Sequence, residues 1–153
     1  MNVLYATVST MKNTKQKTKR KSKYDILPYD LRPKRSKAGI GLYTFSPIKK
    51  GACIIEYVGK ILTEKEEYNS NSLYLFEVTK KVTLDGRPKF NKAGYINHSC
   101  RPNAEVEIYK RRVYVMARRN IKVGEEITYD YGMEYWKEHV KPKGCKCEKC
   151  MGK

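Results

Sequence analysis

The sequence lacks a long apolar run, and its start, Met1–Thr10, lacks the basic-then-apolar order of a secretory signal peptide. Because a helix needs about 20 consecutive apolar residues to cross a bilayer, we expect no membrane span and an intracellular protein. No internal repeat is visible. At 153 residues the chain is long enough for one hydrophobic core but not for two, so we expect a single domain.

Acidic residues are scarce: 16 stand against 33 Lys and Arg, which gives a formal net charge of +17. The run Met11–Lys23 has no acidic or aromatic residue and seven basic ones: Lys12, Lys15, Lys17, Lys19, Arg20, Lys21 and Lys23. Such a run cannot bury apolar surface, so we expect disorder. It is open whether this is a solvated tail, a nonspecific anchor for DNA phosphates, or a nuclear localisation signal at Lys19–Lys21. Base stacking is not indicated.

Short apolar segments separated by turn residues predict a mostly β domain with few short helices. Pro28 and Pro33 predict an extended lead-in over Tyr24–Lys37, with the ordered domain starting near Leu31–Arg35. After it, the pattern predicts strands at 37–43, 52–57, 73–78, 81–84, 104–109 and 112–117.

Two local signals add detail to this β pattern. Lys110-Arg111 separates the last two predicted strands and should form the turn of a hairpin. Thr63, followed three residues later by Glu66, has the spacing of a capping box and predicts a short helix over Thr63–Asn69.

Two polar segments interrupt the apolar pattern. Asn97, His98 and Ser99 are consecutive, and three such side chains inside a compact domain need polar partners, because an unpaired buried group costs about 1–3 kcal/mol. Tyr129 and Tyr131 alternate with Asp130, so an extended chain puts both phenols on one face. Each segment alone fits a structural explanation, a polar turn or a core strand. Together with the motifs below, they favour a ligand site.

Three of the five cysteines form a C-x-C-x-x-C cluster near the end of the chain: Cys145, Cys147 and Cys150. Closely spaced thiols in an intracellular chain favour zinc over disulfides. Zinc takes four ligands, and Cys100 is the natural fourth. The remaining cysteine, Cys53, lies in the apolar run Ala52–Ile55, and we expect it to be a buried core thiol.

Taken in order, these segments resemble the motifs of SET-domain protein lysine methyltransferases. A Gly39-Ile40-Gly41 pattern comes first; alone it is weak, and the third glycine of a dinucleotide-binding loop is missing. The further family marks are Glu56–Gly59, Tyr74–Glu77, Asp85, Asn91–Asn103 and Gly124–Tyr131. The resemblance covers nearly everything but the basic run.

The resemblance implies a SET fold of several short β-sheets, in which the Tyr-Asp-Tyr segment threads through a loop beneath the Asn-His-Ser strand. It implies methyl transfer from S-adenosylmethionine to the ε-amine of a protein lysine, and we expect a histone tail or a similar basic protein. The residues implied to hold the cofactor are Ala38, Gly39, Ile40, Gly41, Asn97 and His98. Those implied to line the lysine channel are Tyr74, Tyr129 and Tyr131, with Tyr131 at the point of transfer.

Two further expectations come from the same resemblance. Tyr129 stands where the family carries Phe or Tyr, which favours monomethylation with some dimethylation. The family also joins a cysteine after Asn-His-Ser to a C-terminal triplet, which implies a zinc site at Cys100, Cys145, Cys147 and Cys150. We therefore divide the chain into a basic tail and lead-in (1–30), a SET domain (31–135) and a post-SET zinc-binding segment (136–153).

The chain departs from the pattern of many relatives in three ways. Gly94-Tyr95 replaces an Arg-Phe pair, the gaps between the terminal cysteines are short, and no cysteine-rich region precedes the domain. We therefore expect a minimal SET domain whose partners supply specificity. In a eukaryote it would be nuclear or chromatin-associated.

Two other function classes remain open beside the enzyme: a catalytically weak SET-like adaptor that binds chromatin or nucleic acid, and a zinc-dependent nucleic-acid-binding domain. The presence of Asn97, His98 and Tyr131 favours the enzyme. Because the positive charge repels a free cationic tail, we expect DNA to attract the protein. An acidic groove would then receive the tail, formed by Glu105, Glu107, Glu125 and Glu126.

Overall fold

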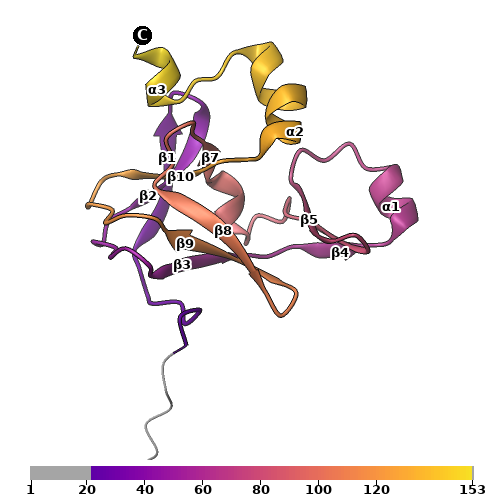
Figure 1. The fold of residues 1–153 in the computed structure, drawn as a ribbon, viewed down its shortest axis with the longest axis horizontal. Helices are drawn as coiled ribbons and strands as arrows, with labels where there is room; N and C mark the ends of the chain where they lie inside the picture. The colour runs from indigo at the N-terminus through magenta and orange to yellow at the C-terminus, as the bar shows by residue number, and fades with distance from the viewer. Residues whose placement is uncertain (1–21, 153) are drawn as a thin grey trace, which may run out of the picture.

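The computed structural model of the protein describes residues 22–152. Most of the run that we expect to be a disordered tail, including the candidate nuclear signal at Lys19–Lys21, lies outside the described residues. Within them the strands form three small sheets and the helices are short (Figure 1). The mostly β fold with few short helices is therefore confirmed. None of the helices in this part of the chain is long and apolar enough to cross a membrane.

The first sheet has the strand order β1-β2-β10-β7 and joins the segments that carry the motifs. β10 runs antiparallel to β2 and parallel to β7, with Thr128 opposite Asn97 and Tyr129 opposite His98. The two polar segments therefore lie side by side, while the threading of the Tyr-Asp-Tyr segment stays a prediction. The strands are β1 (Leu31–Ser36), β2 (Gly39–Thr44), β7 (Asn97–His98) and β10 (Glu126–Tyr129).

Strand β1 forms where the prolines predict only an extended lead-in. It pairs with β2 over its whole length, and Pro33 lies opposite Leu42. β1 stands at the edge of its sheet, and an edge strand tolerates proline because one of its sides needs no strand partner. The prediction of extended backbone is therefore right, but the pairing of this strand was not predicted.

The second sheet, in the order β3-β9-β8, carries the predicted hairpin. Lys110 and Arg111 have φ angles of 49° and 61°, as both central residues of a type I′ turn require. The predicted hairpin is therefore confirmed, and its strand bounds match. The strands are β3 (Cys53–Tyr57), β8 (Ala104–Tyr109) and β9 (Arg112–Ala117).

The third sheet, in the order β4-β6-β5, lies beside the short helix α1 (Glu64–Tyr68). Thr63 caps this helix and forms a capping box with Glu66, as predicted. The strand before it, β4, has only three residues and no alternating pattern, so the sequence did not indicate it. The strands are β4 (Lys60–Leu62), β5 (Leu75–Thr79) and β6 (Val82–Asp85).

After β10 the chain forms short helical turns that the sequence did not predict (Figure 1). They contain no fully buried residue, so they lack the apolar periodicity that marks a helix in a sequence. They are α2 (Met133–Tyr135), the π-helix η2 (Trp136–Val140), the 3-10 helix η3 (Lys141–Lys143) and α3 (Glu148–Met151). A further 3-10 helix, η1 (Lys92–Tyr95), precedes β7.

The hydrophobic core takes residues from all three sheets. It includes Leu42 of β2, Ile54 of β3 and Leu84 of β6. Ile96 is 1% exposed, so the residue directly before Asn97 is anchored in this core. Cys53 is buried as predicted, and its burial raises the pKa of the thiol to about 11.

Candidate active site

A cavity of about 510 Å³ is lined by six tyrosines: Tyr57, Tyr74, Tyr95, Tyr129, Tyr131 and Tyr135. Ala38, Ile40 and Asn97 line the same cavity. The structure thus brings all three predicted channel tyrosines together with three of the six residues expected at a cofactor. The cavity lies where the first sheet meets β3, β5 and α2.

Tyr131 is held in this cavity by its phenol. Its hydroxyl donates a hydrogen bond of 2.8 Å to the carbonyl oxygen of Ile96, and its ring centroid lies 5.1 Å from that of Tyr129. Burial raises the pKa of both phenols well above the usual value. Tyr131 therefore stays protonated, donates its hydroxyl hydrogen bond to Ile96, and offers only oxygen lone pairs to a ligand.

The Gly-x-Gly segment is explained by its surroundings. A Cβ on Gly41 would collide with Oε1 of Glu126 and lie 3.0 Å from Nδ2 of Asn97, so a larger residue would have to displace the Glu126 carboxylate. Gly39 has a φ of 123°, which favours glycine. The amide of Asn97 donates to Glu126 Oε1 at 2.7 Å and to the carbonyl of Ile40 at 3.2 Å. These contacts fix Asn97 against the glycine segment.

His98, the residue after Asn97, lines a second cavity of about 580 Å³. Ala38 and Asn97 line both cavities. The Nδ1 atom of His98 accepts a hydrogen bond of 3.3 Å from the backbone N–H of Tyr131. Burial lowers the pKa of the imidazole, although the nearby carboxylate of Asp130 acts in the other direction. The imidazole is therefore neutral at neutral pH.

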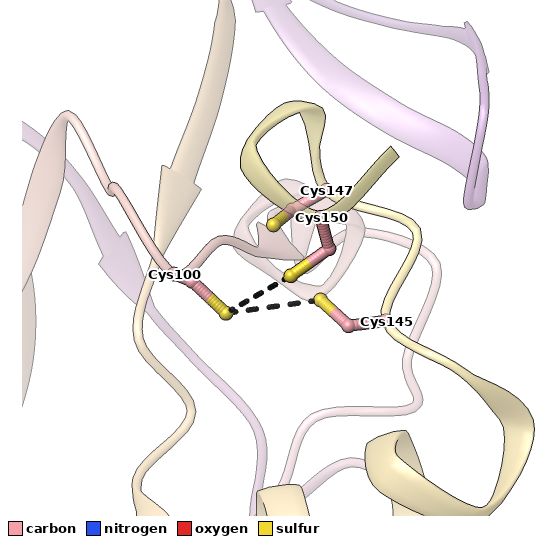
Figure 2. Close-up of side chains that lie close together, drawn as sticks. All are labelled: Cys100, Cys145, Cys147 and Cys150. Atoms are coloured by element: carbon pink, nitrogen blue, oxygen red, sulfur yellow. Dashed lines mark hydrogen bonds between the residues drawn. The ribbon is translucent and has the colours of Figure 1, made fainter. Parts of the chain in front are cut away.

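The four cysteines predicted to form one site do lie together (Figure 2). The sulfur atoms of Cys100, Cys145, Cys147 and Cys150 are all within 4.8 Å of one another, and Cys100 lies 3.9 Å from Cys145 and 3.8 Å from Cys150. Sulfurs at about 2.3 Å from a tetrahedral zinc ion would be ~3.8 Å apart. The spacing and the thiol donors therefore fit zinc.

One thiol of the cluster, that of Cys147, has a lowered pKa, which favours the thiolate form. Burial opposes ionisation of Cys147, but backbone hydrogen bonds at Cys100 and Cys150 outweigh it, so the pKa of Cys147 falls to about 6. A thiolate, rather than a thiol, binds metal. Because Cys100 follows β7 and the other three thiols belong to the end of the chain, a bound ion would hold the C-terminal turns to the first sheet (Figure 2).

Three of the cavity tyrosines, Tyr57, Tyr95 and Tyr135, were not predicted from the sequence to lie there. The hydroxyl of Tyr57 donates to the carbonyl of Tyr74 at 2.8 Å, and that of Tyr135 donates to the carbonyl of Leu73 at 2.9 Å. Tyr135 also meets the ring of Tyr131 edge-on at 5.0 Å. Helix α2 begins only at Met133, after Tyr131, so no helical spacing in the sequence linked the two tyrosines.

The expected acidic groove is not found at this cavity. None of the four glutamates proposed for it lines the tyrosine cavity. Glu107 instead pairs with Lys23 at 2.7 Å, and Glu125 pairs with Arg119 at 2.8 Å. Glu125 and Glu126 line the second cavity instead, so an acidic groove for the tail stays a prediction.

Comparison with known proteins identifies the family. Residues 39–132 match the SET domain. The chain is 36% identical over 108 residues to the histone-lysine N-methyltransferase ASHH3 of Arabidopsis thaliana. This match covers 62% of this chain and 30% of that protein. It is 33% identical over 127 residues to the histone-lysine N-methyltransferase ash1 of Drosophila melanogaster, covering 74% of this chain and 6% of that protein.

A third relative is the histone-lysine N-methyltransferase trithorax of Drosophila virilis, which is 34% identical over 124 residues. This match covers 73% of this chain and 3% of that protein. The chain thus spans less than a third of the length of each of these relatives. The matched segment contains the glycine pair, Asn97, His98 and both motif tyrosines. This chain belongs to the SET-domain family.

Proposed function

We propose that the protein transfers a methyl group from S-adenosylmethionine to the ε-amine of a protein lysine, with a histone as the expected substrate. The observation that carries this proposal is the phenol of Tyr131, which is bonded to Ile96 inside a cavity walled by tyrosines. The names of the relatives, all histone-lysine N-methyltransferases, support the reaction and the substrate class.

S-adenosylmethionine would be held by Ala38, Gly39, Ile40, Gly41, Asn97 and His98. The cradle around Gly41, which a Cβ would fill, supports close approach of a ligand to this backbone. When bound, the cofactor supplies a methyl group that its sulfonium already activates. The protein's own task is therefore to align the lysine and to exclude water.

The tyrosine cavity suits a lysine that must react as a neutral amine. A protonated ε-amine has no lone pair for attack, and burial in an apolar, phenolic channel lowers the pKa of an amine. The hydroxyl hydrogen of Tyr131 is engaged with the carbonyl of Ile96, so the phenol oxygen can accept a hydrogen bond from the amine and orient it. Tyr74, which is half-exposed, would stand at the mouth of the channel.

Tyr129 is proposed to limit the number of methyl groups that are added. Its side chain is buried, and its phenol lies next to that of Tyr131. A hydroxyl at this position occupies space and can hold a water molecule that a second methyl group would need to displace. We therefore propose monomethylation with some dimethylation.

We also propose that Cys100, Cys145, Cys147 and Cys150 hold a zinc ion that closes the C-terminal segment over the site. The donor set and the sulfur spacing support this proposal. The division into tail, SET domain and post-SET segment rests on the same cluster, because the three terminal ligands all lie in the last nine residues.

Nucleosomal DNA is proposed as an additional partner, which in a eukaryote agrees with a nuclear, chromatin-associated protein. The described end of the basic run is attached to the hairpin: the ring of Tyr24 stacks on Tyr109 with a centroid distance of 4.4 Å, and Lys23 pairs with Glu107. The tip of that hairpin is Lys110-Arg111. Lys23, the last residue of the basic run, thus lies on the hairpin that carries two further cations, and together they would bind phosphates.

Tyr131→Phe should lower the rate of methyl transfer by about 10²–10³, as loss of an oriented polar group in an active site does. Binding of S-adenosylmethionine should change little, because the phenol is expected to act on the amine and the methyl group. Calorimetry measures the binding and labelled methyl groups measure the transfer. Tyr114→Phe, at a buried tyrosine outside the cavity, is the control. Loss of cofactor binding in Tyr131→Phe would contradict this role.

Tyr129→Phe should shift the products from monomethyl-lysine toward di- and trimethyl-lysine, because the change removes one hydroxyl from the channel. Mass spectrometry of the product after prolonged reaction measures the distribution. The proposal about Tyr129 is wrong if the variant remains active and its product distribution equals that of the wild type.

The purified protein should contain about one zinc ion per chain, and Cys145→Ser should lower that content. Chelation should also increase hydrogen exchange in the C-terminal turns before the sheets open. Elemental analysis and exchange mass spectrometry measure these effects. Cys53→Ala is the matched control, because that thiol lies in the core and should not affect the zinc content. Full activity of a metal-free protein would contradict a closing role for zinc.

Replacing Lys110 and Arg111 by Glu should weaken binding to duplex DNA and make it less dependent on salt. The logarithmic slope should fall by roughly 0.9 for each phosphate that the protein no longer neutralises. Titration at several salt concentrations measures this slope. The same replacement of Lys80 and Lys81, at the turn between β5 and β6, is a control of equal charge. An equal loss in both variants would mean that only net charge matters.

A further inference from the structure

We propose that His98 is a positioning residue that connects the cysteine cluster to Tyr131, with Nε2–H donating to Cys100 Sγ and Nδ1 accepting from the backbone of Tyr131. This inference deepens the proposed function and rests on Tyr131 and the zinc site having the roles given above. It assigns to the side chain of His98 a role apart from contact with a cofactor.

The tautomer of His98 follows from one contact. The backbone N–H of Tyr131 can only donate, and it lies 3.3 Å from Nδ1. The carboxylate of Asp130 is farther from Nδ1, at 3.6 Å, so the nearer partner favours a lone pair on Nδ1. In a neutral imidazole the proton is then on Nε2. That atom lies 3.4 Å from Cys100 Sγ, which is within the range of an N–H···S hydrogen bond.

The position of the imidazole makes both contacts specific. Its side chain is only 7% exposed, so water has little access to compete for either nitrogen. Ser99 N–H donates to the carbonyl of Tyr129 at 3.0 Å, and the next contact along the pair is Tyr131 N–H to His98. The hydrogen bond from Tyr131 to the imidazole therefore extends the contact between β7 and the other chain segment past Tyr129, the last residue of β10.

Tyr131 is consequently held twice by the same short segment. Its backbone bonds to His98, and its hydroxyl bonds to the carbonyl of Ile96, two residues earlier. The ring centroids of His98 and Tyr131 are 5.5 Å apart. A change in the orientation of the imidazole would therefore move the backbone that carries the phenol.

The cysteine cluster contacts the other nitrogen of the ring, because Cys100 Sγ lies 3.4 Å from Nε2. A zinc-bound thiolate is an acceptor and favours the proton on Nε2, which leaves Nδ1 free for Tyr131. A thiol at Cys100 is itself a weak donor and gives no such preference. Zinc would thus fix the backbone of Tyr131 in addition to closing the C-terminal segment.

The test uses the full chain loaded with cobalt(II), whose thiolate charge-transfer absorption reports hydrogen bonds to sulfur. His98→Asn keeps an oxygen near the position of Nδ1 but has no donor toward Cys100, so this absorption should shift to longer wavelength. His98→Gln keeps an amide N–H near the position of Nε2, so it should keep the cobalt spectrum. His139→Asn, at the other histidine, is the control.

Nuclear magnetic resonance of the zinc-loaded protein supplies the second readout. In the wild type, the ring nitrogens of His98 should show a protonated Nε2 and an unprotonated Nδ1. The amide resonance of Tyr131 should move in His98→Gln and remain near its place in His98→Asn. A protonated Nδ1, or unchanged cobalt spectra and amide resonances in both variants, would overturn the proposal.

These readouts need neither substrate nor methyl transfer, so the outcome is separate from that of the proposed function. If the protein transfers no methyl group but His98→Asn and His98→Gln differ as expected in the cobalt absorption and the Tyr131 resonance, the link from the cluster to Tyr131 stands and the enzyme assignment fails. If transfer occurs but the two variants give the same spectra and resonances, only the role of His98 is wrong.

Discussion

The parallel pairing of β7 with β10 is the contact on which the rest of this structure depends. It has only two residue pairs, Thr128 with Asn97 and Tyr129 with His98, yet it joins segments about 30 residues apart in the sequence. A pairing so short gains little from its own hydrogen bonds. Ile96 and Ile127, at 1% and 0% exposed, anchor both strands in the core and so fix the register.

The consequence of this register is chemical. It places Tyr131 directly beyond the pair, where Ile96 accepts from its hydroxyl and His98 accepts from its backbone. Burial raises the pKa of Tyr131, so the phenol stays protonated throughout the neutral range and cannot serve as a strong base. In the proposed reaction the phenol would therefore orient the amine, which is what a reaction with an already activated methyl donor requires.

Local features of this structure could be predicted from local sequence. The capping box at Thr63 and the hairpin turn at Lys110-Arg111 depend on a few neighbouring residues, and both are found. The cysteine cluster was predictable because zinc ligands have characteristic spacings. The elements that were missed depend on distant partners: β4 pairs with β6, which follows α1 and β5 in the chain, and the C-terminal turns contain no fully buried residue. The places of Tyr57 and Tyr135 in the cavity were also missed, because tertiary packing brings these side chains there.

The most direct test of the central claim is to incubate the purified protein with labelled S-adenosylmethionine and either core histones, nucleosomes or no added substrate, and to map the label by mass spectrometry. The account predicts methyl groups on the ε-amine of histone lysines, with more transfer to nucleosomes than to free histones. Cofactor binding without any lysine methylation of histones or nucleosomes would contradict it.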